Sequence, residues 1–281
     1  MTRHRFRLVN VFAESPLSGN ALCVFEYGRE LSEEKMQALA LQFNLSETTF
    51  VLPSNIATSR VRIFTPMFEM PFAGHPLLGS AHVVRALGHG GDSIRLETKA
   101  GVIPVTANGD VWTLQAKAPH MRPAETTRAQ VAAMLGIELR DVETGFMWVD
   151  TGSEQLMVPL GSPDAVARCR PDPALLARDT SNNLGHSLAY VWARTGADTV
   201  LARFFFLKNG SVVEDPGTGS ACANLGGWLI AMESRLPAVF HIRQGEHTGR
   251  RCRLGLRVDA DKRIFVTGKV VEIGTGEVVL E

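Results

Sequence analysis

Hydrophobic and polar positions alternate in many short segments of this chain, a pattern typical of strands with one buried face. In the first half, strands are predicted at residues 6–12, 21–25, 60–64, 94–96, 102–105 and 111–114. In the second half, they are predicted at residues 145–149, 155–160, 187–192, 200–206, 240–244, 252–258, 264–268 and 270–279. Residues 119–123 carry a proline at each end and predict a linker. Strands therefore dominate both halves of the chain.

Apolar residues at helical spacing lie between some of these strands. Residues 32–43 begin with Ser32, a typical N-cap residue, and continue with an apolar stripe on one face. Shorter helices are predicted at residues 126–135, 163–168 and 173–177. Two further segments, residues 81–87 and 225–232, are apolar on most sides. A helix of that kind is buried, so we expect two central helices.

A glycine-rich turn precedes each of the two apolar helices, and a strand-like segment precedes each turn. Gly74 and Gly79 mark the first turn, and Gly217 and Gly219 mark the second. This loose duplication predicts an α+β protein of two similar domains, each a barrel-like curled sheet around a central helix. The active site is expected in the cleft between the domains, with both helix N-termini pointing into it.

The second turn, residues 214–224, has the composition of a ligand-binding helix start. Gly217 and Gly219 let the backbone turn sharply and approach a ligand closely. Thr218 and Ser220 are suited to cap the helix, whose N-terminus would favour a carboxylate or phosphate. The alternative is a polar turn that only caps a helix, and the turn alone does not decide between the two.

Two polar residues near the predicted strands are further candidates. Asn20, at the edge of the second strand, could bind a polar group of a ligand, although turn-capping is the commoner role of Asn. Glu47 lies at a helix-to-strand junction beside hydroxyl residues and Phe50. In a partly apolar pocket the pKa of such a carboxyl would rise, which would let it hold or deliver a proton. Most Glu residues, however, are solvated on the surface.

Composition and charge exclude several functional classes. The 281 residues suffice for one large or two medium domains. Lys plus Arg and Asp plus Glu both number 29, so nothing in the overall charge favours nucleic acid. No apolar run approaches the roughly 20 residues that span a bilayer, and the N-terminus has no signal-peptide core. These features predict a cytoplasmic protein without a membrane partner.

The cysteines and histidines give no sign of a metal site. Cys23, Cys169, Cys222 and Cys252 are widely scattered, and none forms a Cys-x-x-Cys pair. The eight His residues form no His-x-x-x-His pattern. We therefore expect no metal, and we interpret Cys23 and Cys222, which lie in apolar surroundings, as small core residues.

Four motifs in order along the chain resemble the PhzF-like proteins of phenazine biosynthesis. They are Val11-Phe12 with Gly19-Asn20-Ala21, then residues 44–50 (Asn-Leu-Ser-Glu-Thr-Thr-Phe), residues 72–76 (Phe-Ala-Gly-His-Pro) with Gly79, and residues 214–221 (Glu-Asp-Pro-Gly-Thr-Gly-Ser-Ala). The resemblance covers essentially the whole chain. It implies the diaminopimelate-epimerase-like fold, with residues 1–117 and 122–268 as the two domains and 269–281 returning to the first. It also implies a homodimer.

The same resemblance assigns roles to individual residues. Glu47 matches the catalytic acid/base of the family, and His75 and Asp215 match positions that line or bind the substrate. Because no cysteine is available for proton transfer, we expect His75 and Asp215 to act in catalysis with Glu47. Gly74, Gly219 and Ser220 match positions that line or bind the substrate. Asn20, Gly217 and Thr218 are further binding candidates from the turns themselves. The implied reaction is an isomerisation that moves a proton within a small carboxylate-bearing metabolite, without a cofactor.

The sequence departs from the epimerase relatives, which use one cysteine at the start of each central helix. Ala73 stands at the first position and Asp215-Pro216 at the second, while Cys222 lies further along the helix. Racemisation by two thiols is therefore not expected. Another enzyme of the same cleft, such as an epimerase, racemase or hydrolase, and a non-catalytic metabolite-binding homologue stay open as alternatives.

Overall fold

Strands and a few helices make up two compact units in the computed structural model, which describes residues 1–281. Unit 1 consists of residues Met1–Gln115 and Thr267–Glu281, and unit 2 of residues Ala116–Val266. The long strand β17 (Ile264–Leu280) passes from unit 2 into unit 1. None of the helices has the length and apolarity needed to cross a membrane.

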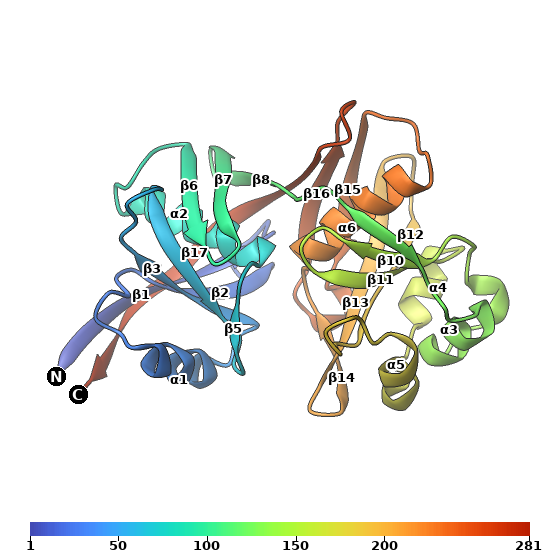
Figure 1. Cartoon of the computed structure of the whole chain (residues 1–281), viewed down its shortest axis with the longest axis horizontal. Coiled ribbons are helices and arrows are strands. Elements are labelled where there is room, and N and C mark those ends of the chain that lie inside the picture. Colours follow the sequence, from blue (N-terminus) through green and yellow to red (C-terminus); the bar gives the residue numbers. More distant parts are fainter. The chain divides into compact units, whose positions relative to one another are not determined.

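Unit 1 contains the elements from the N-terminus to β8 and most of β17 (Figure 1). In chain order they are β1 (Thr2–Val11), β2 (Asn20–Phe25), α1 (Glu33–Phe43), β3 (Glu47–Leu52), β4 (Ser59–Phe64), β5 (Glu69–Met70), α2 (Gly74–Ala86), β6 (Ser93–Thr98), β7 (Gly101–Asn108) and β8 (Val111–Gln115). The strands pair in the closed order β17–β1–β2–β3–β4–β6–β7–β8–β17, so the sheet of unit 1 is a barrel.

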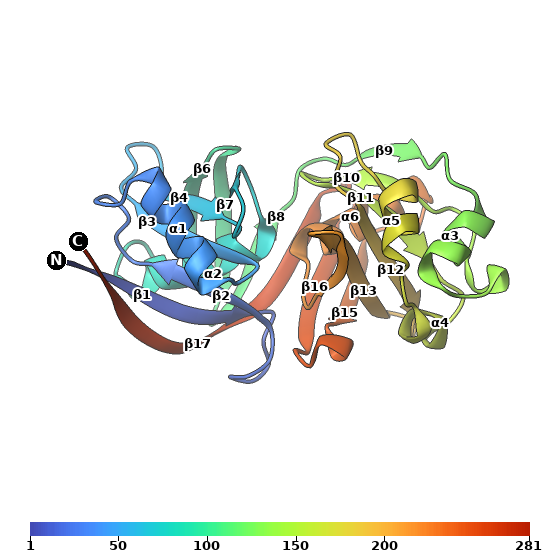
Figure 2. The same cartoon turned by 90° about the horizontal axis from the view of Figure 1, so that it is seen from below.

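Helix α2 fills the inside of this barrel, where it contacts β1, β2, β3, β4, β6, β7 and β8 (Figures 1 and 2). Most of its residues are buried, as expected for a helix that is apolar on nearly all sides. Gly79 lets the helix approach the strands, since a Cβ there would meet Leu22 Cδ2 at 2.6 Å. The barrel and its helix therefore form one core.

Unit 2 contains most of the remaining elements. They are β9 (His120–Pro123), α3 (Arg128–Leu135), a 3-10 turn (Leu139–Asp141), β10 (Met147–Asp150), β11 (Glu154–Pro159), α4 (Pro163–Arg168), α5 (Pro173–Asp179), β12 (Leu188–Arg194), β13 (Thr199–Lys208), β14 (Ser211–Asp215), α6 (Gly219–Ala231), β15 (Ala238–Gln244), a second 3-10 turn (Glu246–Thr248) and β16 (Cys252–Val258). The sheet runs β9–β10–β11–β12–β13–β15–β16, with β14 paired to β13.

Strand pairing repeats between the two units. In each, an antiparallel pair (β1–β2 or β10–β11) is followed by a parallel pair (β2–β3 or β11–β12). The antiparallel pair β3–β4 or β12–β13 comes next, followed by the short hairpin β4–β5 or β13–β14. A central helix, α2 or α6, then leads to a second parallel pair (β4–β6 or β13–β15). Helix α6 contacts β9, β10, β11 and β16. Figure 2 shows strands of the curled sheet of unit 2 around this helix. The predicted fold class, two similar barrel-like units around central helices, is confirmed.

Three boundaries differ from the sequence prediction. Helix α2 begins at Gly74, earlier than its apolar segment, because Pro76 is tolerated in a first turn that needs no N–H from it, whereas α6 begins at Gly219, within the turn where its start was predicted. Residues 120–123 form strand β9 and not a linker, since their backbone pairs with β10. Residues 264–268 and 270–279 form the single strand β17, whose part from Val270 onward pairs with β1 and contains one register shift, opposite Leu8 and Val9.

Candidate active site

The candidates of unit 1 lie at the starts of three neighbouring elements. Asn20 is the first residue of β2, Glu47 the first of β3, and Gly74 the first of α2, with His75 next to it. The parallel pairing of β2 with β3, in which Leu22 faces Glu47, places the starts of both strands at one end of the barrel. The Ala21 backbone reaches His75 by a hydrogen bond. These residues therefore gather at one end of unit 1.

Glu47 and His75 are the closest pair of this group. His75 Nδ1 lies 3.5 Å from Glu47 Oε2, and the two side chains are only 6% and 16% exposed. Burial opposes a charge on the imidazole and lowers the pKa of His75 to about 3, although the hydrogen bond with Ala21 acts in the other direction. His75 is thus neutral near pH 7, and its contact with Glu47 is a polar contact and not an ion pair.

The neutral, buried state of His75 predicts a pH-dependent stability. In the unfolded chain a His takes up a proton below pH of about 6.5, but folded His75 does so only near pH 3. The contribution of neutral His75 to the free energy of unfolding is therefore complete above about pH 6.5, and it falls by up to about 1.4 kcal/mol per pH unit toward pH 3. In urea unfolding from pH 7 to pH 4, the free energy of unfolding should decrease less steeply for His75→Gln than for the wild type. The same change at the exposed His89 should leave the slope as it is, and an unchanged slope for His75→Gln would contradict the prediction.

The two central helices, α2 and α6, differ at their N-termini from the other four α-helices. Ser32, Thr127, Ser162 and Asp172 cap α1, α3, α4 and α5 with side-chain hydrogen bonds. The residues at the same place in α2 and α6, Ala73 and Thr218, make no such bond. Because the first turn of a helix has N–H groups without a partner inside the helix, both central helices can offer theirs to an anion.

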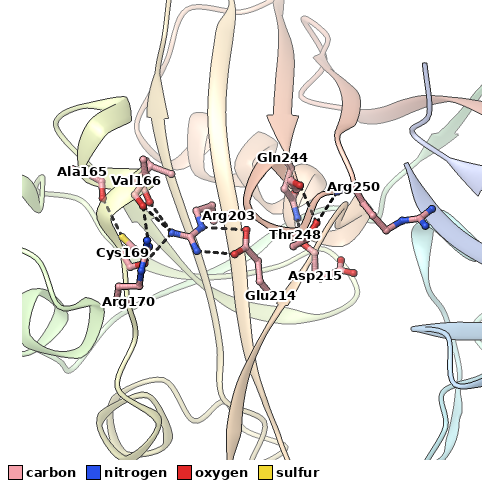
Figure 3. Close-up of polar contacts among 12 residues, drawn as sticks. Ala165, Val166, Cys169, Arg170, Arg203, Glu214, Asp215, Gln244, Thr248 and Arg250 are labelled. Carbon is pink, nitrogen blue, oxygen red and sulfur yellow. Dashed lines mark hydrogen bonds and ion pairs between the residues drawn. The ribbon is translucent and has the colours of Figure 1, made fainter. Parts of the chain in front are cut away.

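The turn before α6 is held by a buried glutamine. Gln244 Nε2 donates to the Asp215 carbonyl and to Thr218 Oγ1, both at 2.9 Å, and its Oε1 accepts from the Thr218 backbone N–H at 3.3 Å. The Thr218 hydroxyl in turn donates to Asp215 Oδ2. Figure 3 shows Gln244 beside Asp215. The Asp215 carboxylate is thereby fixed at the end of β14, directly before the start of α6.

A second network of buried side chains holds Ser220 at the same helix start. Gln155 Nε2 donates to Ser220 Oγ at 2.9 Å, and Gln155 Oε1 accepts from Asn224 Nδ2 at 2.9 Å. Asn224 also accepts from the backbone N–H and the hydroxyl of Thr151, at 2.9 and 2.7 Å. Gln155, Asn224 and Thr151 were not predicted from the sequence. The one available signal was Asn224, a polar residue within an apolar helix.

A buried ion pair anchors the strand that carries Asp215. The Arg203 guanidinium binds both oxygens of Glu214, at 3.1 and 2.7 Å, and donates to the carbonyls of Val166, Ala167 and Cys169 at the end of α4 (Figure 3). Arg203 is 5% exposed. Sequence reasoning missed this pair as well, although an Arg inside the apolar segment 200–206 was a signal.

The structure corrects two expectations about the turns. Thr218 and Ser220 do not cap α6, because the first hydroxyl bonds to Asp215 and the second is held by Gln155. Neither Gly217 nor Gly219 has a positive φ, so the turn does not depend on the left-handed conformation of glycine.

All four cysteines are buried, and for Cys23 and Cys222 this confirms the prediction. Burial raises the pKa of Cys169 to about 12 and the pKa values of Cys23, Cys222 and Cys252 further, so the thiols stay protonated. Cys222 Sγ faces the Gly255 carbonyl, at 3.9 Å, inside unit 2. None of the cysteines stands at the start of a central helix.

We expect the thiols to be dispensable for turnover. Cys222→Ala should retain activity and cost about 1 kcal/mol of stability, the typical effect of a point substitution. Iodoacetamide should leave the native enzyme active and should label all four cysteines only after unfolding. Complete loss of activity in a folded Cys222→Ala protein would contradict this prediction.

Two surface hollows of unit 2, of about 480 and 500 Å³, lie elsewhere. Both include Arg122 in their lining, and neither contains a residue predicted to act on or bind the substrate. The first is mainly apolar and lies against Met121, Phe146 and Met147. The candidate residues are instead those at the starts of strands and central helices.

The fold of this chain is shared with a known epimerase and with proteins of the PhzF family. In fold, the chain resembles a hydroxyproline epimerase from Agrobacterium vitis, with a TM-score of 0.67, 11% identity and coverage of 99% of this chain and 93% of the other. It resembles a PhzF-family phenazine biosynthesis protein from Bacillus anthracis more closely, with a TM-score of 0.87, 23% identity and full coverage of both chains. The two units thus form an epimerase-like fold.

Sequence similarity identifies the family. Residues 9–276 match the family described as phenazine biosynthesis-like protein, and the chain belongs to that family. It is 38% identical to an uncharacterized isomerase from Pasteurella multocida, over 99% of this chain and 94% of the relative. It is 34% identical to trans-2,3-dihydro-3-hydroxyanthranilate isomerase from Pseudomonas chlororaphis, over 99% of this chain and 100% of the relative. The enzyme class, isomerase, follows from this membership.

Proposed function

We propose that the protein is an isomerase in which Glu47 moves a proton between two carbons of a small carboxylate by general acid–base catalysis, without a cofactor. The observation that carries the proposal is the contact of Glu47 with a neutral His75, at 3.5 Å in a largely buried place. Because His75 is uncharged, it does not hold Glu47 permanently in the ionised form as a cation would. Glu47 can therefore take up a proton and give it back.

The start of α6 is assigned to substrate binding. Its first turn has no side-chain cap, and a carboxylate is stabilised at such a helix N-terminus. Ser220 adds a hydroxyl there, and the fixed Asp215 carboxylate accepts from polar hydrogens of the substrate. Gly74, with Asn20 nearby at the start of β2, has the corresponding role in unit 1.

The proposed substrate class is a small cyclic amino carboxylate. The support is the relative named trans-2,3-dihydro-3-hydroxyanthranilate isomerase, which is 34% identical over its whole length. A ring with an amino group, a hydroxyl and a carboxylate offers both donors for Asp215 and an acceptor for Ser220 and the helix N-terminus. An allylic or enol-forming carbon in such a ring is acidic enough for a carboxylate base.

The direct test is incubation of the purified protein with trans-2,3-dihydro-3-hydroxyanthranilate, followed by NMR and mass spectrometry. The proposal predicts a product of unchanged mass in which one ring hydrogen has changed position. Addition of a metal chelator should leave the rate unchanged. A product with a changed mass would indicate another reaction class. Absence of any conversion would refute this substrate.

A further inference from the structure

The hydrogen bonds behind Ser220 run in a defined direction from unit 2's interior to the helix start. The chain is Thr151, Asn224, Gln155 and Ser220, in which the first three are at most 2% exposed. The hydrogen bond from Asn224 to Gln155 and the one from Gln155 to Ser220 are both 2.9 Å long. Inside a protein such bonds polarise one another, and an amide turned the wrong way would leave buried groups unpaired.

Backbone partners fix the orientation of the first amide. The Thr151 backbone N–H can only donate, so the Asn224 group that faces it at 2.9 Å must be the oxygen, Oδ1. The Ser153 carbonyl can only accept, so the group that faces it at 2.9 Å must be the nitrogen, Nδ2. Asn224 Nδ2 therefore points a hydrogen at Gln155.

The second amide follows from the first. Gln155 must turn its oxygen toward Asn224 Nδ2, which leaves its Nε2 directed at Ser220 Oγ. An amide nitrogen donates and does not accept, so Ser220 Oγ accepts this bond. The hydroxyl proton of Ser220 is then left for another acceptor. Because Ser220 is only partly buried, a ligand can be that acceptor.

The duplicated fold puts Gln155 in a position that has a counterpart in unit 1. Ser220 is the second residue of α6, and His75 is the second residue of α2. Ala21, the second residue of β2, holds His75 through its backbone. Gln155 is the second residue of β11, the counterpart of β2, and it holds Ser220. In both units the same strand position orients the side chain that opens the central helix.

We infer that Gln155 is a positioning residue that forces the Ser220 hydroxyl to act as a donor, and so selects a ligand oxygen that can only accept, a carboxylate. This inference rests on the proposed function, in which the substrate carboxylate lies at the start of α6. Gln155 acts through Ser220 and need not touch the substrate. A ligand group with hydrogens at that place, such as a carboxamide, would gain less from a hydroxyl locked as donor.

Gln155→Glu reverses the direction of the hydrogen bond between residue 155 and Ser220. The ionised carboxylate introduced by this change still accepts from Asn224 Nδ2, but its other oxygen can only accept from Ser220 and so takes up the hydroxyl proton. Ser220→Ala removes the hydroxyl altogether. The measurement is the affinity of four proteins, wild type, both single variants and the double variant, for anthranilate and anthranilamide by calorimetry. The two probes differ in the carboxylate alone.

The wild type should bind anthranilate about 10- to 100-fold more tightly than anthranilamide, the scale of a hydrogen bond to a charged group. Gln155→Glu and Ser220→Ala should each remove most of this preference, and the double variant should lose little more than either. Gln155→Glu could also lower the preference for anthranilate by the same factor in the wild type and in Ser220→Ala. The added charge would then act without Ser220, and the inference would be overturned. A Gln155→Glu protein with the full preference would overturn it too.

A second measurement separates this inference from the proposed function. Neutron diffraction from a deuterium-exchanged crystal of the unliganded wild type locates the deuterium on Ser220 Oγ. The inference requires it to point away from Gln155, and a deuterium between Ser220 Oγ and Gln155 would refute the donor role. If that deuterium points away but neither probe binds, the proposed substrate class fails while the orientation by Gln155 stands.

Discussion

Glu47→Gln is expected to lower turnover by about 10²-fold or more while the protein stays folded and binds its ligand. Gln has nearly the size of Glu and keeps a hydrogen-bonding end, so the contact with the neutral His75 is retained. It has no exchangeable carboxyl proton, however, and cannot carry a proton between two carbons. The effect should therefore appear in kcat much more than in KM. Steady-state kinetics with trans-2,3-dihydro-3-hydroxyanthranilate measure both.

The matched control for this variant is Glu97→Gln. Glu97 lies in β6 of the same unit and accepts from the Ser54 hydroxyl, a bond that the amide oxygen of Gln can also accept. It has no place in the proposed mechanism, so its kcat should be that of the wild type. Normal turnover by Glu47→Gln would show that Glu47 is an ordinary residue at the start of a strand.

The largest loss of stability is expected from Arg203→Met. Met fills much of the same volume, but it leaves the Glu214 carboxylate, 12% exposed, without its cation and removes three hydrogen bonds from the carbonyls at the end of α4. Breaking a buried pair from one side costs about 3 to 5 kcal/mol, because the remaining charge is left uncompensated. Chemical denaturation with a two-state fit gives the difference in the free energy of unfolding.

Two further variants show whether the pair itself is responsible. Arg263→Met removes an exposed Arg that pairs with Asp259 and Asp261, and it should change stability by less than about 1 kcal/mol. Arg203→Met combined with Glu214→Leu should recover part of the loss, since no buried charge is then left alone. A small effect of Arg203→Met alone would mean that water reaches Glu214 in the folded protein.

Sequence pattern was sufficient for the fold because the fold is repeated. Two apolar helices, each after a strand and a glycine-rich turn, indicated two similar units, and the pairing of strands in both units agrees. The start of α2 was missed because its first turn holds Gly, His and Pro, a composition that resembles a loop, whereas the start of α6 was placed in its glycine-rich turn. Burial inside a barrel overrides the weak helix propensity of these residues.

The site was only partly accessible from sequence. Glu47 and His75 were named from motifs, and the structure brings them within 3.5 Å of each other. Gln155, Gln244 and Arg203 were missed, because each acts on a residue far away in sequence: Gln155 on Ser220, Gln244 on Thr218 and Arg203 on Glu214. No local sequence spacing reveals the role of a buried amide or guanidinium that orients another side chain. That role becomes visible only from its partners in the three-dimensional structure.

The central claim is that Glu47 carries the proton, and solvent deuterium tests it most directly. With the wild type in deuterated water, Glu47 holds the proton taken from the first carbon, and that proton should exchange with solvent before Glu47 returns it, so NMR of the product should show deuterium at the carbon that gains the proton. Glu47→Gln, with ligand binding confirmed by calorimetry, should show no deuterium at that carbon on the same time scale. Deuterium incorporation by Glu47→Gln at the wild-type rate would contradict the mechanism.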